Sequence, residues 1–344
     1  MKLNTISEAK TCSEAKTCDN AFLERLSFGR RDFLRMTVGG TIAGAGLASL
    51  PFGRALAEPA KLTLDQVNRM DLDAFVAAFG DVIEFTPAAA KEAFTKRPFA
   101  TVTALHESLF DNLRLAPPAE QHTFFRRLSD IGENAVPFTA ASTSEQAKAS
   151  ISSLDAPALA RLHALNVAYR AKFDMSYTIC VRRNTVQRIF DELERRLHNE
   201  KDVELATAVQ EEHLITRIRV VEQVSGPGAP KIYGDITTHV LDAMIGKPAK
   251  GVRVELYDVG WDNPRKVSEA ITNADGRAEL MKERPVPIGR YELRFAMGDY
   301  FRKSRTPVAK PFFDVVPMRL SISKPEESTH VPLIATPFNY STHG

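Results

Sequence analysis

The sequence predicts a multidomain protein in which an all-α helical bundle domain is followed by an all-β sandwich. Apolar residues recur at three-to-four spacing as far as about Val224, and glycine is almost absent from that stretch. Beyond it, apolar and polar residues alternate between turn residues, which is typical of half-buried strands. A length of 344 residues, with 44% apolar and 26% charged residues, suits two globular domains and excludes a disordered or collagen-like chain.

The predicted helical domain spans residues 62–222. Several of its segments show the helical spacing of apolar residues. They are Leu64–Val67, Leu105–Leu113, Glu120–Ile131, Ser144–Ser152, Pro157–Lys172 and Thr185–His198.

A linker is predicted at residues 223–231, because Ser225–Pro230 is rich in Gly and Pro. The sandwich then occupies residues 232–344, an ordinary size for one domain. Its clearest strand patterns are Val252–Tyr257, Gly289–Phe295 and Arg319–Ser323, and Asn273–Gly276 is a predicted turn.

The charge balance gives no electrostatic reason to expect a nucleic-acid partner. The chain has a formal net charge of +2, and residues 1–57 hold eight Lys and Arg against five Asp and Glu. The remainder therefore carries a net charge of −1, and the basic excess belongs to the N-terminal segment.

That N-terminal segment is similar to a twin-arginine export signal. Gly29–Arg35 contains the paired arginines, Met36–Leu50 is uncharged and weakly apolar, and Ala55-Leu56-Ala57 is a small-x-small cleavage site. The resemblance implies export to the periplasm by the twin-arginine machinery, with residues 1–57 removed by cleavage near Ala57. The alternative is a membrane helix, but about 15 residues are fewer than the roughly 20 that a span requires. No other stretch is apolar enough to span a membrane.

After cleavage Cys180 is the only cysteine, so an intrachain disulfide is excluded. No His/Cys cluster has zinc spacing, and no glycine-rich phosphate loop precedes a helix. The sequence therefore predicts neither a metal nor a cofactor.

Six motifs of the sandwich, in order, resemble the transthyretin-related 5-hydroxyisourate hydrolases. They are Ile236–Asp242, Gly246–Ala249, Thr272–Arg277, Gly289–Leu293, Phe312–Pro317 and His330–Leu333.

The resemblance implies a homotetramer and a metal-free cyclic amide hydrolysis in urate degradation. A small purine-derived substrate, 5-hydroxyisourate, would give 2-oxo-4-hydroxy-4-carboxy-5-ureidoimidazoline, and His239, Arg277 and His330 match the catalytic positions. These residue types suit the reaction, because imidazoles can exchange protons with water and a leaving nitrogen, and a guanidinium can stabilise charge on oxygen. His239 shares a strand face with Thr237 and Leu241.

The C-terminus departs from this family, which usually ends in Tyr-Arg-Gly-Ser. Here His343 stands where the tyrosine belongs, followed by Gly344. His343 is either a substitute polar group of the site or a frayed terminal residue.

The helical domain resembles the 2-oxo-4-hydroxy-4-carboxy-5-ureidoimidazoline decarboxylases, which act directly after the hydrolase. Ser142, Glu145, Gln146 and Arg219 match that family's site residues. The matching stretches are Arg97–Phe99, Ser142–Ala147, Leu165–Phe173, Ile179–Arg182 and Ile215–Val220.

The decarboxylase resemblance fails at one chemically important position. The family's Ala-His-Pro-Asp-Leu motif aligns with Arg127–Ile131, so Leu128 stands in place of the catalytic histidine. Leucine cannot exchange a proton, and His122 is predicted to lie about 120° away around the same helix. The helical domain is therefore expected to be inactive, the alternatives being a decarboxylase with rearranged catalysis, which would produce allantoin, and an enzyme with a new substrate.

For the whole chain, the competing class is an exported, non-catalytic ligand-binding protein. His239, Arg277 and His330 favour an enzyme, because a carrier site needs no proton-transfer groups.

Overall fold

The computed structural model describes residues 61–133, 145, 151, 154–261, 263–284, 286–304 and 310–343. The predicted export signal, Ser142, Gln146 and most of the predicted helix Ser144–Ser152 lie outside these residues. Among the helices of the described part, none is long and apolar enough to cross a membrane.

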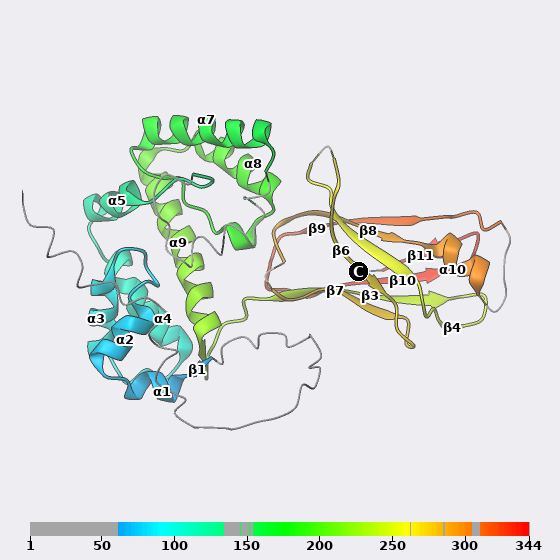
Figure 1. Cartoon of the computed structure of the whole chain (residues 1–344), viewed down its shortest axis with the longest axis horizontal. Coiled ribbons are helices and arrows are strands. Elements are labelled where there is room, and N and C mark those ends of the chain that lie inside the picture. The colour runs from blue at the N-terminus through cyan, green and yellow to red at the C-terminus, as the bar shows by residue number, and fades with distance from the viewer. Residues whose placement is uncertain are drawn as a thin grey trace, which may run out of the picture. The chain divides into compact units, whose positions relative to one another are not determined.

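Helices make up the first part of the structure (Figure 1), and polar N-caps begin several of them. The side chains of Asp71, Thr101, Asp155 and Thr185 each accept a hydrogen bond from a backbone N–H in the first helical turn. The helical elements are α1 (Leu64–Arg69), α2 (Leu72–Phe79), α3 (Pro87–Thr95), α4 (Val102–Arg114), α5 (Pro118–Arg127), α7 (Ala156–Phe173), the 3-10 turn η2 (Val181–Arg183), α8 (Val186–Arg196) and α9 (Lys201–Gln223).

The prediction that a helix continues from Glu120 to Ile131 is wrong at its end. The helix α5 ends at Arg127, and Leu128 is extended with φ −69° and ψ 150°. Tertiary contacts take carbonyls that a longer helix would use: the Ser176 backbone N–H donates to the Phe125 carbonyl at 3.1 Å, and Arg170 donates from Nη1 to the Arg126 carbonyl at 3.4 Å. Leu128 therefore lies outside the helix, and the predicted angle of about 120° around a shared helix does not relate it to His122.

A short parallel pair joins the two ends of the helical part. The strand β1 (Leu62–Thr63) lies beside β2 (Val224–Ser225). The segment that follows β2 contacts α4: Val102 N–H donates to the Pro227 carbonyl at 2.9 Å, and Thr103 donates to the Gly228 carbonyl at 2.6 Å. Gly228 has φ +63°, and a Cβ there would lie 2.7 Å from Thr101, so this turn requires glycine.

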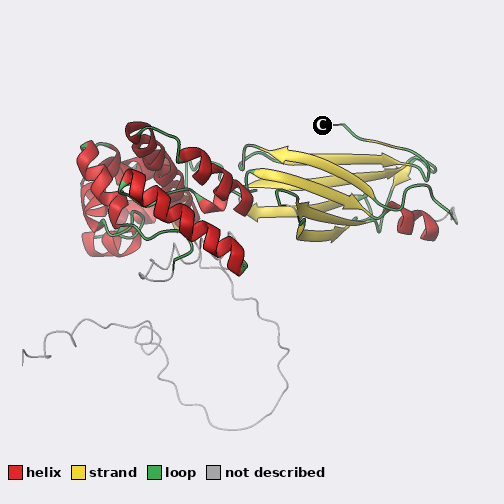
Figure 2. Ribbon diagram, turned by 90° about the horizontal axis from the view of Figure 1, so that it is seen from above, coloured by secondary structure: helices red, strands yellow, loops and turns green. Residues whose placement is uncertain are grey.

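Two sheets form the second part, and the strands are drawn in yellow in Figure 2. One sheet has the order β11-β10-β3-β4, with β7 also pairing with β3, and the other has the order β6-β5-β8-β9. The strands are β3 (Gly234–Asp242), β4 (Lys247–Pro248), β5 (Arg253–Asp258), β6 (Arg265–Ile271), β7 (Arg277–Arg284), β8 (Gly289–Phe295), β9 (Val316–Ile322), β10 (Thr329–Ala335) and β11 (Tyr340–Ser341).

The inward faces of these strands share one apolar core that includes Val240, Leu256, Leu293 and Leu333. The fold class is confirmed, with one addition: the helix α10 (Met297–Lys303) was not predicted, and it buries Met297 in the same core.

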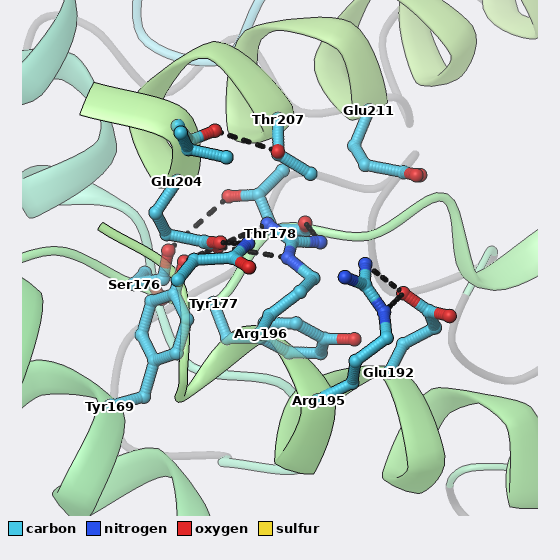
Figure 3. Close-up of polar contacts among 12 residues, drawn as sticks. Tyr169, Ser176, Tyr177, Thr178, Glu192, Arg195, Arg196, Glu204, Thr207 and Glu211 are labelled. Atoms are coloured by element: carbon cyan, nitrogen blue, oxygen red, sulfur yellow. Dashed lines mark hydrogen bonds and ion pairs between the residues drawn. The ribbon is translucent and has the colours of Figure 1, made fainter. Parts of the chain in front are cut away.

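A fully buried ion pair connects α8 to α9 in the helical part (Figure 3). Arg196 donates from Nε to Glu204 Oε1 at 2.8 Å and from Nη1 to the Thr178 carbonyl at 2.8 Å. Asn199 donates to Glu204 Oε2 at 2.7 Å, and the Tyr169 hydroxyl donates to Glu204 Oε1. The pair holds the Tyr177–Thr178 segment, which lines the cavity described below.

Candidate active site

The central strand β3 presents a polar face away from the core. Burial alternates along the strand: Ile236, Thr238 and Val240 are buried, whereas Thr237 and His239 are partly exposed. The predicted sharing of one face by Thr237, His239 and Leu241 is confirmed by this alternation.

Strand register brings the three predicted sandwich residues together on that face. His239 lies opposite Arg277 of β7 and opposite Pro332 of β10. His330 lies two residues before Pro332, on the same face of β10, and is opposite Thr237. Residues distant in sequence therefore form one cluster on the outer face of the sheet.

His330 is held by a direct contact with β3. Its Nδ1 atom shares a hydrogen bond of 2.9 Å with the Thr237 hydroxyl. Burial lowers the pKa of His330, and Arg277, His239 and His343 lower it further by charge repulsion. The ring is consequently neutral near pH 7 and has a nitrogen that can accept a proton.

The predicted turn Asn273–Gly276 is confirmed, and it positions Arg277 at the first residue of β7. The Asn273 side-chain oxygen accepts hydrogen bonds from the backbone N–H groups of Asp275 and Arg277, both at 3.0 Å. Gly276 has φ +71°, and a Cβ there would lie 2.3 Å from the Val240 carbonyl. Only glycine fits where the turn passes this close to β3.

The C-terminal tail returns to this cluster. Its strand β11 pairs with β10, matching Ser341 to Ile334, and the Thr342 hydroxyl donates to the Pro332 carbonyl at 2.6 Å. The tail therefore runs beside β10 as far as Thr342, the residue before His343. His343 is exposed, but it lies close enough to influence His330 electrostatically.

The helical part contains a second candidate site, a cavity beside α9. Charged, polar and apolar side chains converge on it. Among the described residues its lining includes Glu84, Leu128, Ser129, Glu145, Tyr177, Thr178, Cys180, Arg182, Glu212, Ile215, Ile218 and Arg219.

Arg219 and Glu145, two of the predicted residues, form a bidentate pair in this cavity. Arg219 donates from Nε to Glu145 Oε1 at 3.0 Å and from Nη2 to Oε2 at 2.8 Å. Arg219 also donates from Nη1 to the Val82 carbonyl at 3.1 Å, and Glu84 lies 3.8 Å from Nη2. Both members of the pair are buried, so Glu145 is not a surface residue.

Leu128 lines the cavity, as expected for the position of the family's histidine, whereas His122 does not. The Nε2 atom of His122 is instead hydrogen-bonded to the Phe173 carbonyl at 2.9 Å. The sequence reasoning missed Glu212, a lining residue, and Thr237, the partner of His330. Glu212 could have been found from its spacing: it lies seven residues, or about two helical turns, before Arg219, so both side chains share one helix face.

Two other groups have metal-ligand or nucleophile chemistry. Ligand atoms of His106, Glu107 and His213 lie within 4.8 Å of one another. Glu107 is bonded to His213 at 2.8 Å, and the neutral His106 ring, whose pKa burial lowers to about 3, is bonded to Thr216 at 3.0 Å. Burial raises the pKa of the Cys180 thiol to about 12, with Glu211 and Glu145 adding to the rise. This cysteine is therefore a protonated thiol at neutral pH, not a nucleophile.

The fold and the site define the class: a helical domain followed by a transthyretin-like sandwich whose outer face carries two histidines and an arginine. Residues 68–221 match the OHCU decarboxylase family, and residues 236–344 match the HIUase/Transthyretin family. The chain belongs to both families, through its helical and its sandwich part respectively.

Two curated relatives, one for each part, agree with this division. A 5-hydroxyisourate hydrolase of Deinococcus radiodurans is 46% identical over 110 residues, which cover 31% of this chain and 92% of that protein. A 2-oxo-4-hydroxy-4-carboxy-5-ureidoimidazoline decarboxylase of Haloferax volcanii is 34% identical over 165 residues, which cover 48% of this chain and 98% of that protein. A crystal structure of (S)-allantoin synthase covers 82% of this chain and 99% of that chain, at 22% identity and a TM-score of 0.43.

Proposed function

We propose that the sandwich hydrolyses 5-hydroxyisourate to 2-oxo-4-hydroxy-4-carboxy-5-ureidoimidazoline. The observation that carries the proposal is the meeting of His239, Arg277 and His330 on one sheet face, in a chain 46% identical to a 5-hydroxyisourate hydrolase over the sandwich. A carrier site would need apolar or charged contacts but no pair of imidazoles.

Each residue has a role that its environment supports. His330 is uncharged at neutral pH and takes a proton from the water whose oxygen attacks the acyl carbon. Arg277 donates to the oxyanion that forms on that carbon. His239, opposite Arg277 and two residues along β3 from the partner of His330, delivers a proton to the ring nitrogen as the carbon–nitrogen bond breaks. Thr237 is a positioning residue that orients the His330 ring.

The test is the decay of freshly generated 5-hydroxyisourate, followed by its ultraviolet absorbance, with and without the purified full chain. Faster decay with the protein is expected. Decay at the spontaneous rate would overturn the proposal and favour a ligand-binding protein.

We also propose export to the periplasm by the twin-arginine machinery. The support is the sequence of residues 29–57, with Arg30-Arg31 before the uncharged stretch. Replacing both arginines by lysine is expected to retain the protein in the cytoplasmic fraction of a bacterial host, because the signal is read by a receptor. Fractionation of cells expressing both forms checks this. Equal periplasmic recovery of the two forms would contradict it.

We further propose that the chain assembles as a homotetramer through the sandwich. The support is an exposed apolar surface near the tail: Phe312 is 76% and Phe338 is 62% exposed. Light scattering during size exclusion is expected to give four times the 38.1 kDa of the chain. A monomer mass at micromolar concentration would contradict the assembly.

A further inference from the structure

We propose that Glu212 is the proton-donating residue of the helical cavity and that it performs the chemistry for which Leu128 is unsuited. The cavity would take a small, planar ureido compound that bears a carboxylate. This inference rests on the proposed function in one respect, because hydrolysis in the sandwich would produce such a carboxylate.

The position of Glu212 supports this assignment. Its side chain lies on α9, one turn before Ile215 and two turns before Arg219, so all three face the same cavity. Glu212 is 3% exposed. Its Oε1 atom is buried and has no hydrogen-bond partner among the described residues. A buried carboxyl group without a partner is costly, and a bound ligand would supply the missing hydrogen bond.

Burial favours the protonated form of Glu212 and is the main cause that raises its pKa to about 7. Among the charged neighbours, Arg219 lowers this pKa, whereas Glu84 and Glu145 raise it by repulsion. Arg219 is already bonded to both oxygens of Glu145. The remaining cation of the lining, Arg182, is paired with Glu222 at 2.6 Å. Glu212 can therefore hold a proton near neutral pH, unlike an ordinary carboxyl group.

The other lining groups indicate which ligand fits. The Glu145 and Glu84 carboxylates can accept hydrogen bonds from N–H groups of a ureido ligand. Leu128, Ile215 and Ile218 provide apolar contacts for a flat ring. The protonated Glu212 adds a proton donor beside these two carboxylates.

The proposed step is decarboxylation, and its atoms and charges balance. The bond between the ring carbon and the carboxylate breaks, CO2 leaves, and the electron pair stays on the carbon. Glu212 gives its proton to that carbon and becomes a carboxylate, which regains a proton from water before the next turnover.

The experiment supplies the carboxylate substrate independently of the sandwich. A large excess of a separate 5-hydroxyisourate hydrolase first converts 5-hydroxyisourate, after which the full chain is added. CO2 release and the circular dichroism of the product are followed, because spontaneous decarboxylation without a chiral catalyst gives a racemic product. The wild-type chain is expected to release CO2 faster than buffer and to give an optically active product.

Two variants separate proton donation from general effects. Glu212→Gln is expected to lower the rate by about 10²–10⁴-fold, because an amide cannot donate this proton. Asp202→Asn, an exposed control on the same helix, is expected to retain the wild-type rate. If Glu212→Gln does not fold, the wild-type rate still tests the proposal, since it should fall as the pH rises through about 7.

Three results would overturn the proposal: no CO2 release above the spontaneous rate, a wild-type rate in Glu212→Gln, or a rate that does not change between about pH 6 and 8. None of them depends on whether the sandwich hydrolyses 5-hydroxyisourate. Failure of this inference and failure of the proposed function are therefore distinguishable.

Discussion

Replacing His330 by alanine is expected to lower kcat/KM for 5-hydroxyisourate by about 10²–10⁴-fold, the usual contribution of a positioned proton-transfer group. The reason is local: the pKa of His330 is lowered, first by burial and then by Arg277, His239 and His343. Alanine leaves Thr237 and the strand pairing of β10 in place, so folding should change little. The measurement is the initial rate of substrate decay above the spontaneous rate.

The matched control is His198→Ala, which removes an exposed histidine of the helical part and should leave the rate unchanged. Equal rates for His330→Ala and the wild type would remove His330 from the mechanism. A loss in both variants would point to a general effect of the substitutions rather than to the site.

The pH profile gives a second readout of the same prediction. The acidic limb of kcat/KM is expected below the ordinary histidine pKa of about 6.5, because His330 must be neutral to accept a proton. Arg277→Gln removes a nearby positive charge, so the pKa of His330 should rise and the limb should move to higher pH. A structural role for Arg277 would lower the rate without moving the limb.

Glu204→Gln is expected to lower the free energy of unfolding of the helical part by about 3–5 kcal/mol, as typically occurs when one partner of a buried ion pair is removed. Glu204 is 0% and Arg196 is 1% exposed, so solvent does not screen the charge that remains. The substitution leaves the Arg196 charge without its counterion and weakens the bond from Tyr169.

Glu194→Gln is the control, because it removes a carboxylate from an exposed ion pair. Glu194 accepts a hydrogen bond from Arg161 at 2.5 Å, but both side chains are nearly half exposed, so the loss should be at most about 1 kcal/mol. Urea unfolding followed by far-ultraviolet circular dichroism reports mainly on the helices. Equal losses in the two variants would show that burial does not determine the strength of the Glu204 pair.

The sandwich site was largely predictable from the sequence. The alternation of β3 defines which side chains share a face, and this is a local property of an extended chain. The Asn-Ala-Asp-Gly turn before Arg277 is also encoded locally, because Asn273 bonds to its own neighbours and Gly276 adopts a positive φ. Motif resemblance then pointed to His239, Arg277 and His330, but it carried no information on their distances.

The helical cavity was predictable only in part. Arg219 and Glu145 were found by resemblance, and the structure pairs them. Glu212 was missed, because its spacing of seven residues from Arg219 is the one local feature that separates it from the exposed acids of α9. The predicted end of α5 was wrong for a related reason. Periodicity alone extends that helix to Ile131, but Arg170 and Ser176, more than 40 residues away in sequence, take the carbonyls of Arg126 and Phe125.

Local patterns in the amino-acid sequence thus account for the two-part fold, the polar face of β3 and the residue types of the hydrolase site. Tertiary contacts decided the rest: strand pairing over more than 90 residues sets His330 beside Thr237, and the returning tail brings His343 close enough to lower the pKa of His330. Packing of α9 buries Glu212 in a cavity shared with Arg219 and Leu128. The division has a physical reason. Periodicity and turn chemistry act between neighbours in the chain, whereas desolvation and charge pairing depend on which distant residues the fold brings together.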